Sequence, residues 1–246
     1  MSEPKGPGAA WTEERGTSDE GPPPQAAKTA RQHLKGPPEV SEHEIRDQPE
    51  HWPVVASAEL LRSRLVTVRS DKVLTPDNDL AERDVVLHPG AVAVLALDDA
   101  DRILMIRQYR HPVGRLLWEI PAGLRDVAGE ASWITAPREL MEEAGYRAKD
   151  WRVLADYYSS PGYSTERLRV FLARALEPIP AAERQFVPRD EEAHLLLGWL
   201  PLDEAVCKVF AGELHNGPAV LAIMAGYAAR SEGYDRLRPA DAPEEQ

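Results

Sequence analysis

The segment that follows Gly123 is rich in charged side chains. It contains Glu130 and then Arg138, Glu139, Glu142 and Glu143. On a helix, residues three and four positions apart share a face, so the last three carboxylates should project together. Two carboxylates about 4 Å apart repel each other by roughly 4 kcal/mol at an effective dielectric constant near 20. A cation is therefore expected among them, and oxygen ligands without Cys or His favour magnesium or manganese, which commonly bridge to phosphate groups.

This stretch resembles the signature of the Nudix hydrolases, in which a Gly, a Glu, an Arg-Glu pair, a Glu-Glu pair and a final Gly recur at fixed spacing. The matching positions are Gly123, Glu130, Arg138, Glu139, Leu140, Glu142, Glu143 and Gly145. Six residues separate Gly123 from Glu130 where the family pattern has five, and we expect the loop to absorb the extra one. Because Pro137 would damage a helix interior, we expect the helix to begin near Thr135, with Pro137 in its first turn.

Acidic runs on helices are usually solvated faces, and this helix also carries an apolar stripe that any surface helix could use to pack on a sheet. The stripe consists of Trp133, Pro137, Leu140, Met141 and Ala144. The full string of glycine, arginine and four glutamates in register favours the catalytic interpretation over the solvated one.

The organisation of the chain changes near residue 50. Residues 1–50 hold 8 of the 22 prolines and few large aliphatic side chains. Such a segment cannot bury enough surface to offset its ordering entropy, so we predict a disordered tail, with partner binding as an alternative. We predict a folded domain over 51–235 and a flexible tail over 236–246.

Short apolar runs bounded by turn residues predict strands within this domain. One expected pair of strands covers 65–68 and 84–87, and a second covers 91–96 and 103–106. Further strands are expected over 151–157, 167–173 and 194–200, and helices over 202–211 and 217–229. Interleaved strands and helices predict an α/β fold, with an N-terminal antiparallel strand region over 51–90 and a mixed sheet sandwiched between helices.

Composition excludes several classes of partner. The net charge of −12 argues against a nucleic-acid partner, because phosphate-backbone binding needs clustered Lys and Arg. The single cysteine, Cys207, excludes an intrachain disulfide and fits a reducing cytoplasm. No apolar run approaches the roughly 20 residues of a membrane span. We therefore expect a cytoplasmic protein without a nucleic-acid or membrane partner.

The resemblance extends over about residues 55–235 and is closest to the ADP-ribose pyrophosphatases of actinobacteria. It implies that Arg110 contacts the phosphate-ribose part of the substrate, where a planar guanidinium suits phosphate oxygens. Trp118, Glu119, Gly123 and Leu124 would line the pocket, although Trp118 can equally be a core aromatic residue.

A second loop, Ser-Pro-Gly followed by Ser-Thr-Glu, resembles the segment that holds the terminal ribose in these enzymes. Its matching residues are Pro161, Gly162, Ser164 and Glu166. Glu166 is the expected acceptor from a sugar hydroxyl. Small residues and glycine allow the backbone to approach a sugar closely.

In the resembling enzymes, a glutamate on a mobile loop beyond the signature acts as base or water-positioner. The matching segment here supplies Asp190, Glu191 and Glu192, of which we favour Glu191 and Glu192 jointly. The resemblance implies Mg²⁺, which Mn²⁺ can replace, held by the Ala122 carbonyl and by Glu139, Glu142, Glu143 and Glu192. Arg138 would orient the glutamates by ion pairing.

The implied reaction is hydrolysis of ADP-ribose to AMP and ribose 5-phosphate by a homodimer with exchanged N-terminal strands. One alternative is a Nudix hydrolase of another nucleoside diphosphate sugar or dinucleotide, such as GDP-mannose or NADH. A second alternative, of another class, is a protein without catalysis that senses ADP-ribose or NAD metabolites.

Overall fold

The computed structural model describes residues 39–183 and 195–244, and the chain divides into two units, 1–50 and 51–246. The predicted disordered tail therefore lies mostly outside the described residues. Its described part holds one short helical turn, η1 (Glu42–Glu44), in which Ser41 and Glu44 form a capping box.

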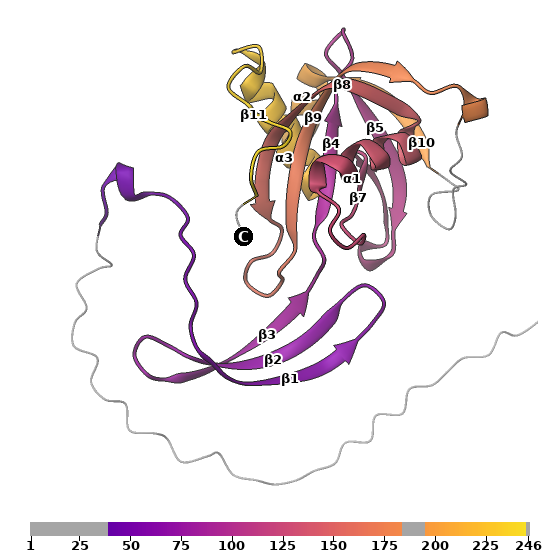
Figure 1. Ribbon diagram of the computed structural model, residues 1–246. Helices are drawn as coiled ribbons and strands as arrows, with labels where there is room; N and C mark the ends of the chain where they lie inside the picture. Colours follow the sequence, from indigo (N-terminus) through magenta and orange to yellow (C-terminus); the bar gives the residue numbers. More distant parts are fainter. Residues whose placement is uncertain (1–38, 184–194, 245–246) are drawn as a thin grey trace, which may run out of the picture. The chain divides into compact units, whose positions relative to one another are not determined.

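The N-terminal strand region is an antiparallel sheet of three consecutive strands, drawn in indigo and purple in Figure 1. They are β1 (Val54–Arg62), β2 (Thr67–Leu74) and β3 (Leu80–Leu87). The expected strand pair is confirmed over Thr67 and Val68, which lie opposite Leu87 and Val86. The turn between β2 and β3 places Asn78 in the left-handed region, at φ 62°.

The largest sheet has the strand order β11-β8-β9-β4-β7. Its strands are β4 (Ala91–Ala96), β7 (Ala122–Leu124), β8 (Tyr146–Tyr158), β9 (Arg167–Pro178) and β11 (Arg238–Pro239). β4 runs parallel to β9 and antiparallel to β7, so the sheet is mixed, as predicted. A second sheet has the order β10-β5-β6 and contains β5 (Arg102–Arg110), β6 (Arg115–Glu119) and β10 (Leu196–Pro201).

The expected pairing of 91–96 with 103–106 is wrong. β4 and β5 belong to different sheets, and the described residues join them only through an isolated bridge between Leu97 and Ile103. Every residue of β4 is buried, which is typical of a central strand with neighbours on both edges and layers on both faces.

Alternation along β4 distributes its side chains between two cores. Val92, Val94 and Ala96 pack with Leu140 and other residues of the signature helix. Ala93, Leu95 and Leu97 pack with the C-terminal helices α2 (Leu202–Phe210) and α3 (Gly217–Arg230). Both helices occur where the sequence predicts them, and Asn216 caps α3 by accepting from the N–H of Ala219 at 3.0 Å. The sheet therefore lies between helices on its two faces.

The signature helix differs from the expected one. α1 (Ser132–Glu139) begins three residues before Thr135, so Pro137 lies inside the helix. Since proline has no N–H to donate, one helical hydrogen bond is missing there. The next turn, η3 (Leu140–Ala144), widens to a π-helix and ends at Gly145, which has φ 70°.

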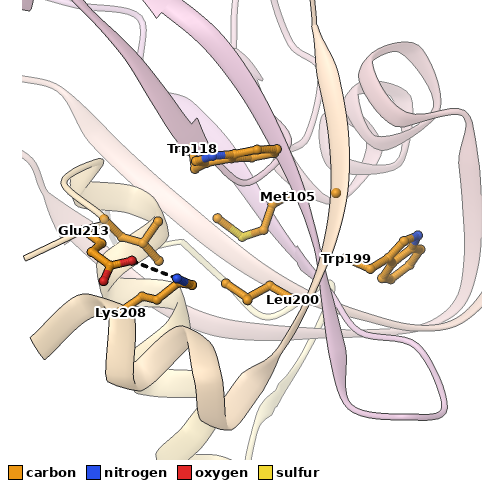
Figure 2. Close-up of a pocket in the computed structure, with 8 residues that line it drawn as sticks. Met105, Trp118, Trp199, Leu200, Lys208 and Glu213 are labelled. Carbon is orange, nitrogen blue, oxygen red and sulfur yellow. Dashed lines mark hydrogen bonds and ion pairs between the residues drawn. The ribbon is translucent and has the colours of Figure 1, made fainter. Parts of the chain in front are cut away.

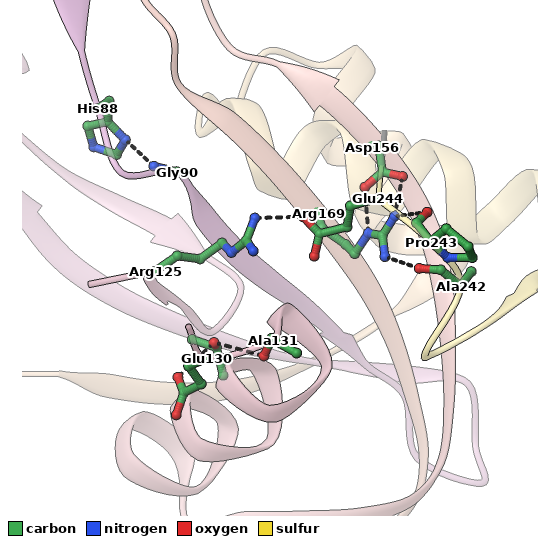
Figure 3. Close-up of polar contacts among 11 residues, drawn as sticks. His88, Gly90, Arg125, Glu130, Ala131, Asp156, Arg169, Ala242, Pro243 and Glu244 are labelled. Atoms are coloured by element: carbon green, nitrogen blue, oxygen red, sulfur yellow. Dashed lines mark hydrogen bonds and ion pairs between the residues drawn. The ribbon is translucent and has the colours of Figure 1, made fainter. Parts of the chain in front are cut away.

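Residues of the predicted C-terminal tail are held against the sheet, because β11 pairs with β8. The Arg169 side chain, 2% exposed, donates to both oxygens of Asp156 at 2.7 and 2.9 Å and to the carbonyl of Ala242 at 2.6 Å. Arg125 pairs with Glu244 at 2.6 Å, as Figure 3 shows. Within the described ranges, no helix has the length and apolarity that a membrane crossing requires.

Candidate functional site

A cleft of about 480 Å³ brings together residues that are far apart in the sequence. Six of the residues predicted for substrate or metal line it: Arg110, Glu119, Ala122, Gly123, Leu124 and Glu166. They come from the end of β5, from β6, from β7 and from the residue just before β9. The cleft is therefore built where the two sheets and the signature loop meet.

Two glutamates of the signature helix reach the backbone of β7. The Oε2 atom of Glu143 accepts a hydrogen bond from the N–H of Ala122 at 2.8 Å. The carboxylate of Glu139 covers Gly123 so closely that a Cβ atom built on this glycine would lie 2.1 Å from the Glu139 Cδ atom. A side chain on residue 123 would therefore force the Glu139 carboxylate away from this backbone.

Arg138 has the contacts that an orienting role requires. Its guanidinium lies 2.7 Å from Glu139, 3.2 Å from Glu142 and 3.4 Å from Glu130. Glu130 in turn accepts from the Thr135 hydroxyl at 2.8 Å. The Arg138 side chain thus lies among three of the four carboxylates of the signature.

Glu139 has an unusual affinity for protons. Burial raises the pKa of its carboxyl to about 7, although the neighbouring Arg138 acts in the opposite direction. The positive charge near Glu139 is therefore too small to offset the effect of burial on its ionised form. A cation bound beside it would favour the ionised form.

The signature glutamates fit a hard divalent cation in their chemistry but not in their present orientations. Among the described residues, no three Asp, Glu, His or Cys side chains converge closely enough to hold a metal ion in their present orientations. Glu139 and Glu142 contact Arg138, and Glu143 contacts the Ala122 backbone. Glu139 and Glu143 nevertheless reach one dipeptide of β7 with oxygen ligands alone, which is the chemistry that magnesium prefers.

Arg110 and Glu119 form a bidentate ion pair across β5 and β6. The Nε and Nη2 atoms of Arg110 lie 2.8 and 2.7 Å from the two oxygens of Glu119, whose side chain is 2% exposed. Gln108 also donates to Glu119, at 3.3 Å. This pairing fixes the plane of the guanidinium at the edge of the cleft.

Trp118 is not brought to this cleft. It points to the opposite face of β6 and lines a separate cavity of about 440 Å³ with Met105, Leu200 and the Lys208–Glu213 ion pair (Figure 2). Its ring packs against Gly198, where an added Cβ would lie 3.2 Å away. Alternation along a strand explains the outcome, because Leu117 and Glu119 face the cleft and the residue between them cannot.

The predicted ribose loop is only partly in place. Glu166 lines the cleft, while Pro161 and Gly162 are exposed and are not among its lining residues. Ser164 is not among the lining residues either, and its hydroxyl accepts a hydrogen bond from the N–H of Glu166 at 3.1 Å. Asp190, Glu191 and Glu192 lie outside the described residues.

Sequence reasoning missed His88 as a residue of this cleft. Its Nε2 atom lies 3.6 Å from the Oε1 atom of Glu166. The available signal was the His-Pro-Gly turn immediately before the buried strand β4, a place where a side chain is held rigidly at the end of a strand.

Comparisons with known proteins agree with this geometry. A model of the NUDIX domain matches residues 87–221. The chain is 42% identical over 187 residues to an ADP-ribose pyrophosphatase of Mycobacterium tuberculosis, covering 76% of this chain and 88% of that protein. It is 34% identical over 169 residues to an ADP-ribose pyrophosphatase of Bacillus subtilis, covering 69% and 89%.

Among solved structures, that of an ADP compounds hydrolase aligns with a TM-score of 0.64 at 22% identity, covering 76% of this chain and 99% of the other. This likeness supports the fold. Together with the domain match and the arrangement of the signature glutamates around Gly123, it leads to one conclusion: the chain belongs to the Nudix hydrolase family.

Proposed function

We propose that this protein hydrolyses the pyrophosphate bond of ADP-ribose, giving AMP and ribose 5-phosphate, with Mg²⁺ as the required ion and Mn²⁺ as a substitute. The observation that carries the proposal is a cleft with Arg110 at its edge, Glu166 in its wall and β7 as part of its lining. The backbone of β7 is contacted by Glu143 at Ala122 and by Glu139 at Gly123. The similarity to two ADP-ribose pyrophosphatases supports the choice of substrate.

Each group of residues has a chemical task in this proposal. Glu139, Glu142 and Glu143, with the Ala122 carbonyl and Glu192, would hold magnesium. Magnesium, when bound, neutralises charge on diphosphate oxygens and makes water a better nucleophile at neutral pH. Arg138 keeps the carboxylates oriented, and Arg110 binds a phosphate oxygen through its planar guanidinium. Glu191 and Glu192 position the attacking water.

The variant Glu143→Gln tests the catalytic part of the proposal. It keeps the shape of the side chain and removes one ligand charge, so kcat should fall by about 100-fold or more at saturating magnesium, with little change in Tm. Glu204→Gln, a substitution on the exposed face of α2, serves as the control. Turnover of Glu143→Gln close to that of the wild type would refute the assignment.

A substrate panel separates the alternatives. ADP-ribose, GDP-mannose and NADH are compared by kcat/KM with detection of the released nucleotide and sugar phosphate. A preference for GDP-mannose or NADH would replace ADP-ribose as substrate within the same enzyme class. Tight binding of ADP-ribose without magnesium-dependent turnover would indicate a sensor.

We also propose that two copies associate through the sheet of β1–β3. Its exposed side chains include Val54, Val55, Leu60, Leu61 and Leu80, all more than half exposed, from 52% to 64%. An apolar surface of this kind is typical of an interface and not of a solvated sheet. A second copy would bury it and give the homodimer that the family resemblance implies.

A further inference from the structure

The ring of His88 has a defined hydrogen-bonding arrangement. Its Nδ1 atom accepts a hydrogen bond from the backbone N–H of Gly90 at 3.1 Å, as Figure 3 shows. A backbone N–H can only donate, so Nδ1 carries no proton. In the neutral imidazole the proton is therefore on Nε2.

The Nε2 atom of His88 lies near a carboxylate oxygen of Glu166. Nε2 lies 3.6 Å from Oε1 of Glu166, and both side chains line the cleft. This separation is too long for a direct hydrogen bond. The other oxygen of Glu166, Oε2, accepts from the Ser159 hydroxyl. A donor on one chain segment and an acceptor on another thus stand opposite each other.

The two segments are tied together by their backbones. The N–H of His88 donates to the Thr165 hydroxyl at 3.0 Å, and the N–H of Thr165 donates to the Val86 carbonyl at 3.0 Å. The His88 side chain is 11% exposed and Glu166 is 30% exposed. The fold therefore holds the backbone segments that carry the donor and the acceptor side by side before any substrate arrives.

We propose that His88 is a substrate-binding residue and that His88 and Glu166 together bind one sugar hydroxyl. The hydroxyl oxygen accepts from Nε2–H and its proton is donated to Oε1. Two hydrogen bonds of about 2.8 Å from one oxygen would meet at about 80° across the present gap of 3.6 Å, so the bound hydroxyl separates the two groups to about 4.6 Å to reach a near-tetrahedral angle. This inference rests on the proposed function, since it assigns the sugar end of a nucleoside diphosphate sugar to this wall.

The chemistry of the pair selects a hydroxyl over the other groups of such a substrate. A phosphate oxygen cannot donate and would meet the negative charge of Glu166. A deoxy position offers neither donor nor acceptor and would leave both protein groups unpaired, which is costly in a partly buried site. His88 and Glu166 therefore discriminate between sugars and their deoxy analogues.

Two variants of His88 test the assignment with full-length protein. His88→Asn keeps an acceptor close to the Gly90 N–H and removes the donor that faces Glu166. Its KM for ADP-ribose should rise about 10-fold while kcat stays within about twofold, because the lost bond is made in ground and transition state alike. His88→Gln places an amide N–H at about the depth of Nε2 and should recover part of the loss. His51→Asn, at an exposed position, is the control.

A deoxy analogue of ADP-ribose completes the test. The wild type should lose about 10-fold in kcat/KM when the terminal-ribose hydroxyl bound here is absent, and His88→Asn should lose little more from the same change. Equal losses in both proteins for every deoxy position, or an unchanged KM in His88→Asn, would overturn the inference. If His88→Asn unfolds, His88→Ala, which likewise removes the donor at Nε2, carries the same comparison.

The outcome for His88 is separable from that for the proposed function. No turnover of ADP-ribose by the wild type would refute the proposed substrate, and the deoxy comparison then uses the best sugar nucleotide of the panel. Turnover of ADP-ribose with no effect of His88 variants would refute only the present inference.

Discussion

Gly123 and Glu139 are in contact across the junction between β7 and α1, with the Glu139 carboxylate in the space that a Cβ atom on residue 123 would fill. Such a Cβ would lie 2.1 Å from Cδ and 2.3 and 2.4 Å from the two carboxylate oxygens. No side chain tolerates contacts this short. The position of the Glu139 carboxylate therefore depends on the absence of a side chain at Gly123.

The variant Gly123→Ala should displace the Glu139 carboxylate by more than 1 Å. We expect kcat/KM to fall about 100-fold, because a catalytic group misplaced by that distance loses most of its effect. Gly217→Ala, at a position with no heavy atom within 4 Å of the added Cβ, should stay within about twofold of the wild type. Steady-state kinetics at saturating magnesium checks both, and equal activity of the two variants would contradict the contact.

Arg110 should matter for stability as well as for binding. Arg110→Ala leaves the buried Glu119 carboxylate without its bidentate partner, so we expect a loss of about 2 kcal/mol in the free energy of unfolding. The double variant Arg110→Ala/Glu119→Gln removes the uncompensated charge and should recover stability without recovering activity. Urea unfolding and ADP-ribose kinetics on both proteins, with Arg115→Ala as control, measure the two effects separately.

The ion pair that holds the C-terminal segment should give a stability that depends on pH. Burial alone would raise the pKa of Asp156, but the hydrogen bonds from Arg169 and Arg238 lower it below the usual value of 3.8. Because the folded-state pKa is depressed, this contribution is fully present above the usual pKa and is lost as the pH falls through the lowered one.

Asp156→Asn should therefore cost about 3 kcal/mol at pH 7, and the difference from the wild type should shrink below about pH 4. Asp150→Asn, on the same strand and with a half-exposed ion pair, should cost less than about 1 kcal/mol. Unfolding by urea at several pH values gives both curves. A constant difference between the Asp156→Asn and wild-type curves would rule out this origin of the stability.

The β1–β3 sheet gives a prediction about the oligomer. The wild type should have twice the chain mass in solution, and Leu60→Glu/Leu61→Glu should shift it to the monomer, because two charges would be buried in an apolar interface. Light scattering coupled to size-exclusion chromatography measures the mass. A wild type that stays monomeric at high concentration would contradict the proposed interface.

Local sequence patterns predict the structure correctly where the spacing of residues along one helix or strand is sufficient to define that element. The two C-terminal helices occur where the sequence predicts them. The signature helix begins three residues earlier than the sequence predicts, because the intrinsic cost of an interior proline does not by itself decide where a helix starts. Packing of Ala136 and Leu140 against β4 outweighs that cost.

The types and spacing of the signature residues, read along the chain, determined the family and the acidic character of its signature, because both are properties of the sequence itself. Tertiary structure alone decided that β4 pairs with β9 and β7 and not with β5, that Trp118 faces away from the cleft, and that His88 meets Glu166. Such contacts join residues distant in sequence, and their partners are chosen by how the sheets stack and bury their faces.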